Sequence, residues 1–324
     1  MPCEPRATRR GILAALGAWP AAAAAQDAGR TVRIIVPIAP GGLTDGLARL
    51  LARRLSERTG QSFVVENRPG GGGIIGMEAA ARAAPDGSTL VLVYQGVASV
   101  NPVLHRNLSY DTLRDFSGIG MVGRFPILLT VPANMEVRDA AGFIAAAKRQ
   151  PGALSYGSAG NATTSHLAME LFKRQAGIDI VHVPFRGEAP ALTELAAGRV
   201  AAVFATVAAA RPLIEGGRVR AIGVATAEAS ALAPGVTPIA TSGLPGFEVS
   251  GWYGLLAPRG TPSPAIGRLN AELHAILAEA ETRERLAAMG LEPSTGTPES
   301  CEAWIRAETE TWRGVIAVAG IRAD

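Results

Sequence analysis

From Val32 onward, short apolar runs alternate with amphipathic segments. The run VRIIV at 32–36 is rich in β-branched residues and predicts a buried strand. A helix is predicted after it by apolar residues at helical spacing: Leu47, Leu50, Leu51 and Leu55. The runs SFVV and STLVLV predict two further strands, with a helix between them that ends near Ala84. This order predicts a parallel sheet covered by helices, and hence an α/β fold.

The same alternation resumes between 118 and 131 and continues to about 225. Strands are expected at 154–157, 179–184, 200–205 and 219–225. Helices are expected between them, at 140–148, 164–176, 190–197 and 208–215. These residues predict a second α/β unit.

The C-terminal part of the chain adds helices rather than strands. After a strand-like run at 248–258, helices are expected from Pro264, at 281–289 and from Pro298. They need a sheet that already exists, so the chain is expected to cross between the units near 122–130 and to return near 249–257. We therefore predict two hinged lobes. Their expected bounds are 26–125 plus 252–324 for lobe 1 and 126–251 for lobe 2.

The N-terminus is typical of an export signal. Basic residues in RATRR precede the apolar stretch GILAALGAWPAAAAA, and Ala23-Ala24-Ala25 offers a cleavage site. We therefore exclude residues 1–25 from the fold and expect a periplasmic location, with cleavage near Ala25. The stretch from Thr8 to Leu13 also resembles a twin-arginine signal, so the ordinary and the twin-arginine routes both stay open.

Removal of this segment changes the charge argument. It contains three arginines and one glutamate, so the formal charge falls from +3 to +1. No basic cluster is interleaved with aromatic residues, and we expect no nucleic-acid partner. Cys301 then remains alone, which excludes an intramolecular disulfide. The four histidines have no metal-ligand spacing, so no metal site is expected.

The glycine run at 70–76 formally fits a dinucleotide fingerprint, through Gly71, Gly73 and Gly76. The acidic residue expected about 20 positions further on is missing, because that count ends near Gln95. Nicotinamide cofactors are also not normally available to exported proteins. We therefore expect no cofactor.

Three loops between a strand and a helix carry the candidate chemistry. In PIAPGGLTD at 37–45, glycines expose the main chain at a helix start, which favours a bound anion. Thr44 adds a hydroxyl there, whereas Asp45 is expected to cap or brace the loop. GSAGNATTSH at 157–166 combines hydroxyls and amides at a second helix start. In PFRGEAP at 184–190, Arg186 is either a carboxylate ligand or a solvated surface residue.

The second loop also permits a hydrolase hypothesis. Ser158 would be the nucleophile, His166 the base and Asp179 the residue that orients the base. The sequence around Ser158 is not the G-x-S-x-G elbow, which weakens this alternative. In the expected return strand, Trp252 and Tyr253 either pack in the hinge or form a wall of a cleft.

Taken together, these stretches resemble the Bug-type periplasmic solute receptors of tripartite tricarboxylate transporters. The resemblance covers nearly all of the chain beyond the signal. It rests on VPIAPGGLTD, VVENRPGGGGIIG, AAPDGSTLVL, NPVL, YGSAGNATTSHLAMELF, VHVPFRG, LPGFEVSGWYGLLAPRGTPSP and GTPESCEAWIRAE. It implies a type II flytrap fold, in which two α/β lobes are joined by two crossing strands. It also implies a monomeric protein without catalytic activity that passes a small organic carboxylate to integral-membrane transporter subunits.

The resemblance also implies the ligand contacts and the role of the glycine run. That run would shape the first lobe rather than bind a nucleotide. The expected ligand-binding residues are Pro40, Gly41, Gly42, Thr44, Asp45, Gln95, Ser158, Ala159, Gly160, Thr163, Thr164, His166, Phe185, Arg186, Gly187 and Thr206.

One stretch departs from the family. The family commonly reads VDVMFDN where this chain has VAAVFAT, so Ala201 and Ala205 stand at usually acidic positions. A carboxylate that would meet a ligand ammonium is therefore missing, and we expect an unaminated acid, such as a dicarboxylate or an aromatic acid. A receptor that signals to a membrane sensor would have the same features, so that alternative stays open.

Overall fold

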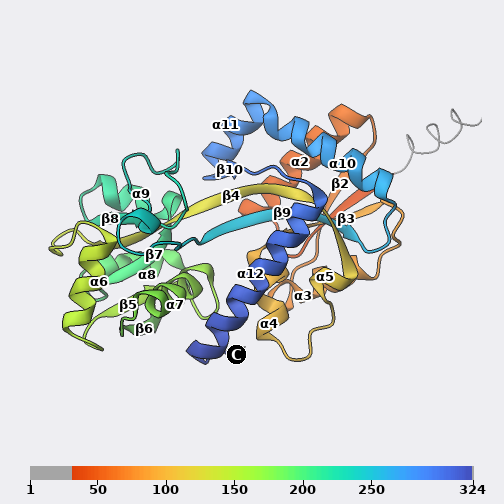
Figure 1. Cartoon of the computed structure of the whole chain (residues 1–324). Coiled ribbons are helices and arrows are strands. Elements are labelled where there is room, and N and C mark those ends of the chain that lie inside the picture. Colours follow the sequence, from red (N-terminus) through yellow and green to blue (C-terminus); the bar gives the residue numbers. More distant parts are fainter. Residues whose placement is uncertain (1–30, 323–324) are drawn as a thin grey trace, which may run out of the picture.

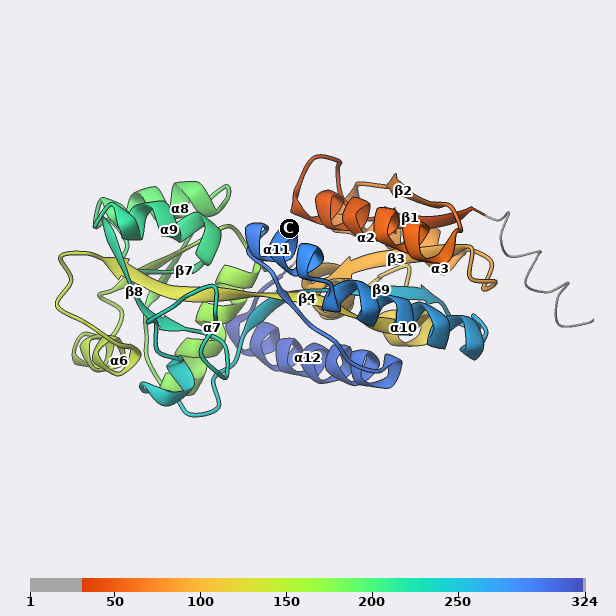
Figure 2. The same ribbon diagram turned by 90° about the horizontal axis from the view of Figure 1, so that it is seen from above.

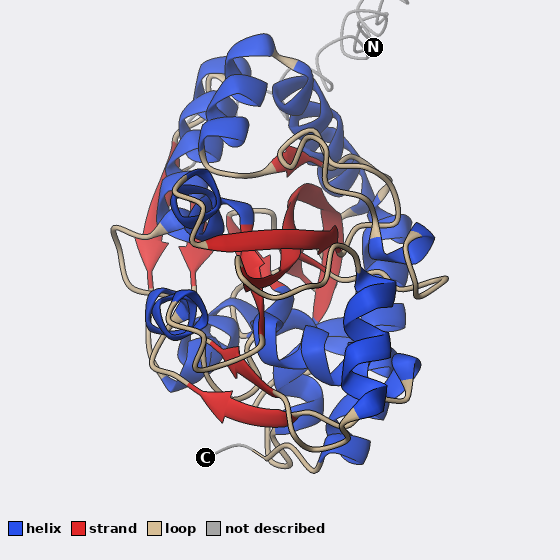
Figure 3. Cartoon of the chain, turned by 90° about the vertical axis from the view of Figure 1, so that its left-hand side faces the viewer, coloured by secondary structure: helices blue, strands red, loops and turns tan. Residues whose placement is uncertain are grey.

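The computed structural model describes residues 31–322 and shows two lobes bridged by long strands (Figure 1). The predicted export signal at 1–25 lies outside the described residues. In Figure 3 the helices lie on both sides of the strands, as expected for an α/β fold. None of the described helices is long and apolar enough to cross a membrane.

The first lobe is built on three parallel strands. Strand β1 (Val32–Val36) lies between β2 (Phe63–Asn67) and β3 (Thr89–Tyr94), with Ile34 opposite both Val65 and Leu90. Helix α2 (Leu43–Thr59) buries its predicted leucines beneath this sheet, and α3 (Ile74–Ala81) follows the glycine run, whose short 3₁₀ turn is η1 (Gly71–Gly73). The predicted strand–helix order of this lobe is confirmed.

The second lobe has a mixed sheet. In it β5 (Ser155–Ser158) lies parallel to both β6 (Val181–Pro184) and β7 (Ala202–Thr206). Strand β8 (Val219–Val224) is antiparallel to the crossing strand β4 (Phe116–Pro132). The covering helices are α6 (Ala140–Arg149), α7 (Thr164–Ala176), α8 (Glu188–Ala196) and α9 (Val207–Glu215), and a short turn η3 (Ile239–Thr241) follows. The bounds of α7 match the prediction because Thr163 stands at its start and Gly177 ends it in a left-handed conformation.

Two antiparallel strands join the lobes, as predicted. They are β4 (Phe116–Pro132) and β9 (Ser250–Pro258), and Arg124 lies opposite Trp252 between the lobes. Strand β4 pairs with β9 in the first lobe and with β7 and β8 in the second. One strand thus belongs to both sheets, and Figures 1 and 2 show it spanning the molecule.

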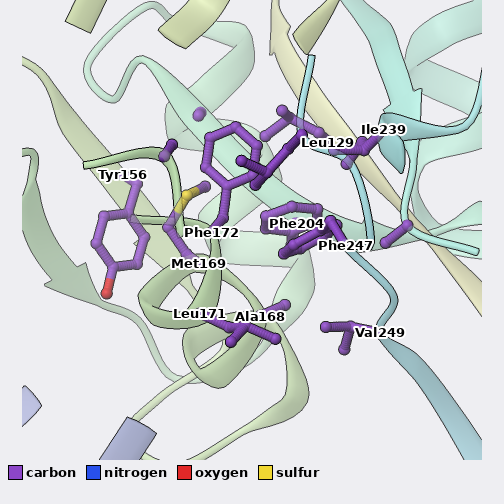
Figure 4. Packing of buried hydrophobic residues seen from close by; sticks show 14 of the residues in the cluster. Leu129, Tyr156, Ala168, Met169, Leu171, Phe172, Phe204, Ile239, Phe247 and Val249 are labelled. Carbon is purple, nitrogen blue, oxygen red and sulfur yellow. The ribbon is translucent and has the colours of Figure 1, made fainter. Parts of the chain in front are cut away.

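The core of the second lobe is aromatic (Figure 4). Phe172 of α7 makes edge contacts with Phe204 and with Phe247, at centroid distances of 5.9 and 5.5 Å. Such contacts add stability beyond the burial of apolar area. They hold α7, and with it the second candidate loop, against the sheet.

The C-terminal helices are α10 (Ser263–Ala278), α11 (Ala280–Ala288) and α12 (Pro298–Ala319). Cys301 and Ile305 of α12 pack in a cluster of the first lobe. Trp312 and Ile316, further along the same helix, pack with the core of the second lobe. Helix α12 therefore contacts both lobes.

The sequence pattern did not predict several short elements between β3 and β4. These are a π-helical turn η2 (Gly96–Val100), α4 (Asn101–Leu104) and α5 (Thr112–Asp115); the two-residue strand β10 (Glu292–Pro293) was also not predicted. A wide π turn is common at functional sites, and η2 begins directly after Gln95.

Candidate functional site

A cavity of about 500 Å³ lies between the lobes. Its walls come from the crossing strands, from the segment after β3 in the first lobe, and from the loop before α7 in the second lobe. The lining residues are Gly72, Tyr94, Gln95, Gly96, Val100, Asn101, Leu104, His105, Phe125, Asn161, Ala162, Thr163, Thr164, Trp252 and Tyr253. This set contains no Asp, Glu, Lys or Arg. The cavity therefore offers aromatic surfaces, amides and hydroxyls to a ligand.

The first loop is braced from inside by Asp45. Its carboxylate accepts hydrogen bonds from the Gly41 N–H and from Arg49 Nε, each at 3.0 Å, and from Asn67 Nδ2 at 3.0 Å. The hydrogen bond from Arg49, followed by that from Gly41, lowers the pKa of Asp45 to about 2. The carboxylate thus braces the loop, as we expected.

This bracing leaves the start of α2 uncapped. Gly42 is the N-cap residue, and no side chain caps the first N–H groups of the helix. Gly41, at φ +93°, needs the freedom of glycine, whereas Gly42 is extended. Pro40, Gly41 and Gly42 are exposed, and Thr44 Oγ1 donates to the hydroxyl of Tyr253, a cavity residue, at 3.3 Å. The first anion site therefore lies close to the cavity wall.

The glycine run packs beneath this loop. A Cβ atom on Gly76 would lie 2.7 Å from Pro37 Cα, so only glycine allows this approach. Asn101 Nδ2 donates to the Gly72 carbonyl at 3.1 Å, which ties the run to the cavity wall. The run thus has the shaping role that we expected, and Gly72 itself lines the cavity.

The second loop presents the start of α7 to the cavity. Thr163 is the N-cap residue, but its hydroxyl donates to the Gly160 carbonyl at 2.7 Å instead of capping the helix. Ala162 has φ +56° and is the single non-glycine residue with positive φ in the described part of the chain. Such strain is common at ligand-binding sites. The uncapped N–H groups of α7 can therefore receive an anion.

Three amides before Thr163 are already bound within the loop. The Ala159 N–H donates to Ser165 Oγ at 2.9 Å, and the Gly160 N–H donates to Ser158 Oγ at 3.2 Å. The Ala162 N–H donates to His166 Nδ1 at 3.0 Å. These bonds fix the loop and leave the start of the helix as its open donor surface.

Two stacked histidines support this loop. The rings of His166 and His182 lie 3.9 Å apart at an interplanar angle of 11°, and the ring of Tyr156 stacks on His182 at 4.8 Å. Burial and the neighbouring His182 lower the pKa of His166 to about 4, and burial also lowers the pKa of His182. His166 is therefore neutral at pH 7, as its acceptor role toward Ala162 requires.

The pairing of Ser158 with His166 on which the hydrolase alternative depends is not observed. Ser158 Oγ lies instead 2.6 Å from Nε2 of His182. The register of β5 and β6 places Tyr156 opposite His182, and Ser158, two residues further along β5, lies on the same face of the sheet as Tyr156. Ser158 is fully buried, and Asp179 is exposed and makes no hydrogen bond to either ring among the described residues. This geometry does not present a nucleophile to the cavity.

Gln95 joins three parts of the molecule. Its side chain is buried in the cavity wall, and its Oε1 accepts from Thr164 Oγ1 across the lobes at 2.7 Å. Its Nε2 donates to Glu308 of α12 at 2.7 Å. Gln95 thus links the two lobes and helix α12 through hydrogen bonds.

The third loop and Thr206 lie outside the cavity lining. Phe185 packs in the apolar cluster under α8, and the Gly187 N–H donates to the Ala159 carbonyl at 3.1 Å. Arg186 is exposed and forms no ion pair within the described residues. The N–H and hydroxyl of Thr206 both donate to Glu188. A carboxylate of the protein thus occupies the start of α9.

Of the expected site residues, the cavity lining contains Gln95, Thr163 and Thr164. The expected residues of the first loop lie beside the lining, and those around Ser158 lie behind it as support. The sequence reasoning did not predict Tyr94, Asn101, His105, Phe125 or Asn161. Tyr94 ends β3, and ligands of α/β sheets bind beyond the carboxyl ends of strands, so that signal was present.

Comparison with known proteins identifies the family of this chain. The family pattern described as "Tripartite tricarboxylate transporter family receptor" matches residues 47–321. The chain belongs to this family. The UPF0065 protein in the tcbD-tcbE intergenic region of Pseudomonas sp. (strain P51) is 38% identical over 296 residues, which cover 91% of this chain and 88% of that protein.

Two solved structures of similar proteins contain carboxylates. The first is R. palustris Rpa4515 with adipate, whose sequence is 38% identical to this chain and whose structure matches with a TM-score of 0.73. The match covers 90% of this chain and 98% of Rpa4515. The second is MatC (Rpa3494) from Rhodopseudomonas palustris with bound malate, which is 32% identical and matches with a TM-score of 0.69. That match covers 89% of this chain and 99% of MatC. The expected receptor family and its two-lobed fold are confirmed.

Within this receptor family, the cavity between the lobes is the feature that a binding function needs. The histidine stack and Asp45 act on the shape of the two loops. Among the described residues, no group of three His, Cys, Asp or Glu side chains could hold a metal ion.

Proposed function

We propose that this receptor captures a small organic carboxylate in the cavity between its lobes and passes it to a membrane transporter. The proposal rests on the cavity of about 500 Å³, which residues of both lobes line. The uncapped start of α7 faces this cavity. The N–H groups at a helix start attract anions. The uncapped start of α2, whose Thr44 bonds to Tyr253 of the cavity wall, would add further donors to this capture.

The lining also indicates how the ligand would be released. No Lys or Arg side chain lines the cavity, so a carboxylate would be held by amides, hydroxyls and the His105 ring. Breaking a buried ion pair carries a large cost, because it leaves an uncompensated charge. Amide donors avoid that cost. A ligand that contacts both lobes favours the closed form by its differential affinity, and closure then presents a composite surface to the transporter.

The uncharged lining supports an unaminated ligand. Ala205 is fully buried and packs in an apolar cluster, and Ala201 is half-buried against the core of the second lobe. No carboxylate lines the cavity to meet an ammonium group. Tyr94, Phe125 and Trp252 supply aromatic surface for the body of the ligand instead.

Calorimetry on residues 26–324 tests this proposal. The ligands would be adipate and malate, which the two similar structures contain, together with benzoate and glutamate. We expect binding of at least one unaminated acid and none of glutamate. Replacement of Thr163 and Thr164 by valine should weaken that binding, because both hydroxyls lie in the cavity wall. Selective binding of glutamate would refute the ligand class, and the absence of carboxylate binding would refute the function.

The sequence and the family support export to the periplasm and a membrane partner. An N-terminal segment typical of export and a receptor fold support a periplasmic location. Cell fractionation of the tagged full chain should place it in the periplasm. Replacement of Arg9 and Arg10 by lysine should block export if the twin-arginine route is used.

A further inference from the structure

Glu308 is a half-buried acid that the capture mechanism does not use directly. Its carboxylate lies where α12 passes behind the cavity. Oε1 accepts from Gln95 Nε2 at 2.7 Å, and Oε2 accepts from Trp252 Nε1 at 2.6 Å. Both donors belong to residues that line the cavity. Glu308 thus contacts the cavity wall from behind.

An ionised carboxylate can only accept hydrogen bonds, which determines the orientation of the Gln95 amide. With its NH₂ group held by Glu308, Gln95 presents Oε1 toward the second lobe. There Oε1 accepts from Thr164 Oγ1 at 2.7 Å. If the amide were reversed, Oε1 would face a carboxylate oxygen, and the two acceptors would repel.

Burial raises the pKa of Glu308, and the hydrogen bonds from Gln95 and Trp252 offset only part of that rise. Ser99 and Trp312 also lower it, although Ser99 Oγ and Trp312 Nε1 have no partner at full hydrogen-bond geometry within the described residues. The two donors that bond to this carboxylate, Gln95 and Trp252, both come from the cavity wall.

We propose that Glu308 is a positioning residue for lobe closure: it orients Gln95 so that the amide oxygen receives Thr164 across the cleft. This inference rests on the proposed function and identifies the hydrogen bond between Thr164 and Gln95 as the contact that stabilises the closed form. The contact joins two side chains of the protein itself, so its test needs no ligand, and a failed ligand screen would leave the result unaffected.

The experiment measures the distance between the lobes by pulsed electron paramagnetic resonance on ligand-free residues 26–324. Spin labels are attached after the exposed residues Arg53 of α2 and Ala197, directly after α8, are replaced by cysteine. The native Cys301 is fully buried, and burial raises its pKa to about 12, so it does not compete for the label.

We expect wild-type protein to show a closed population with the short distance. Glu308→Gln and Thr164→Val should each raise the open-to-closed ratio roughly five-fold, the value of one intramolecular hydrogen bond. The double variant should change it no further than either single variant. Thr164→Ser, which keeps the hydroxyl, should restore the wild-type ratio.

Glu302→Gln is the matched control. Glu302 lies on the same helix and accepts from the Gly118 N–H at 3.0 Å, away from the cavity lining. Its replacement should leave the distance distribution unchanged. Circular dichroism confirms that each variant is folded. Independent, additive effects of Glu308→Gln and Thr164→Val would overturn the proposal. So would an unchanged distribution in Glu308→Gln, or a wild-type protein that never adopts the short distance.

Discussion

Replacement of Gly42 by leucine should separate binding from folding. Gly42 has φ −90° and ψ −179°, an extended conformation that any residue adopts. A Cβ atom on it would meet no heavy atom within 4 Å. The one expected cost is that leucine is a poorer N-cap residue than glycine, which amounts to about 0.5–1 kcal/mol. In a chain of this size that corresponds to a fall in Tm of roughly 1–4 °C.

The expected effect on binding is much larger. A leucine side chain at the start of α2 would cover the N–H groups that we expect to reach the carboxylate. A hydrogen bond to a charged group contributes about 1.5–3 kcal/mol. Loss of two such bonds corresponds to about 3–6 kcal/mol, which is more than 100-fold in Kd. Isothermal titration with the tightest acid from the ligand screen gives this value, and thermal melts give the stability.

Two further variants make the result interpretable. Gly267→Leu adds the same bulk on α10, where a Cβ atom also meets no heavy atom within 4 Å, and should leave the affinity unchanged. Gly41→Leu forces leucine into φ +93° and should destabilise the protein more than Gly42→Leu does. Wild-type affinity in a folded Gly42→Leu variant would refute the first anion site.

Three other changes test the supporting structure. Asp45→Asn should lower the free energy of unfolding by about 1 kcal/mol at pH 7, measured by urea titration. Because the pKa of Asp45 is lowered to about 2, the difference between variant and wild type should disappear as the pH falls from about 4 toward 2. The pKa of His166 is lowered to about 4, so wild-type stability should fall as pH drops from about 6.5 toward 4, and His166→Gln should remove part of that fall. Gly251→Ala would place a Cβ atom 1.7 Å from Phe125 Cζ and should cost about 1–3 kcal/mol in thermal melts. Gly254→Ala, with its nearest contact at 3.4 Å, is the control and should cost less; equal costs would contradict the packing argument.

Much of the fold could be predicted because local signals agreed with the global arrangement. Helix α7 was predicted at its observed bounds, since Thr163 and Gly177 mark both ends. The crossing strands could be placed because three terminal helices had no sheet of their own. The contact of α12 with both lobes could not be predicted, because an amphipathic pattern shows which face is buried but not against which partner.

The candidate site was predictable where its chemistry lies in one loop. Glycine and threonine at a helix start mark a donor surface from local sequence alone. The sequence did not reveal which histidine contacts Ser158, because strand register decides this. The contact of Gln95 with Glu308 joins residues 213 positions apart, and no local pattern indicates it.

The carboxylates of the protein itself explain which helix starts remain open. Glu188 binds both the N–H and the hydroxyl of Thr206, so the start of α9 already holds an anion. Asp45 binds the Gly41 N–H but leaves the first turn of α2 uncapped. Thr163, which could cap α7, bonds to Gly160 instead. A free carboxylate therefore finds unoccupied donors at one helix start in each lobe. Under the proposed function, this arrangement would let a single small acid draw the two lobes together.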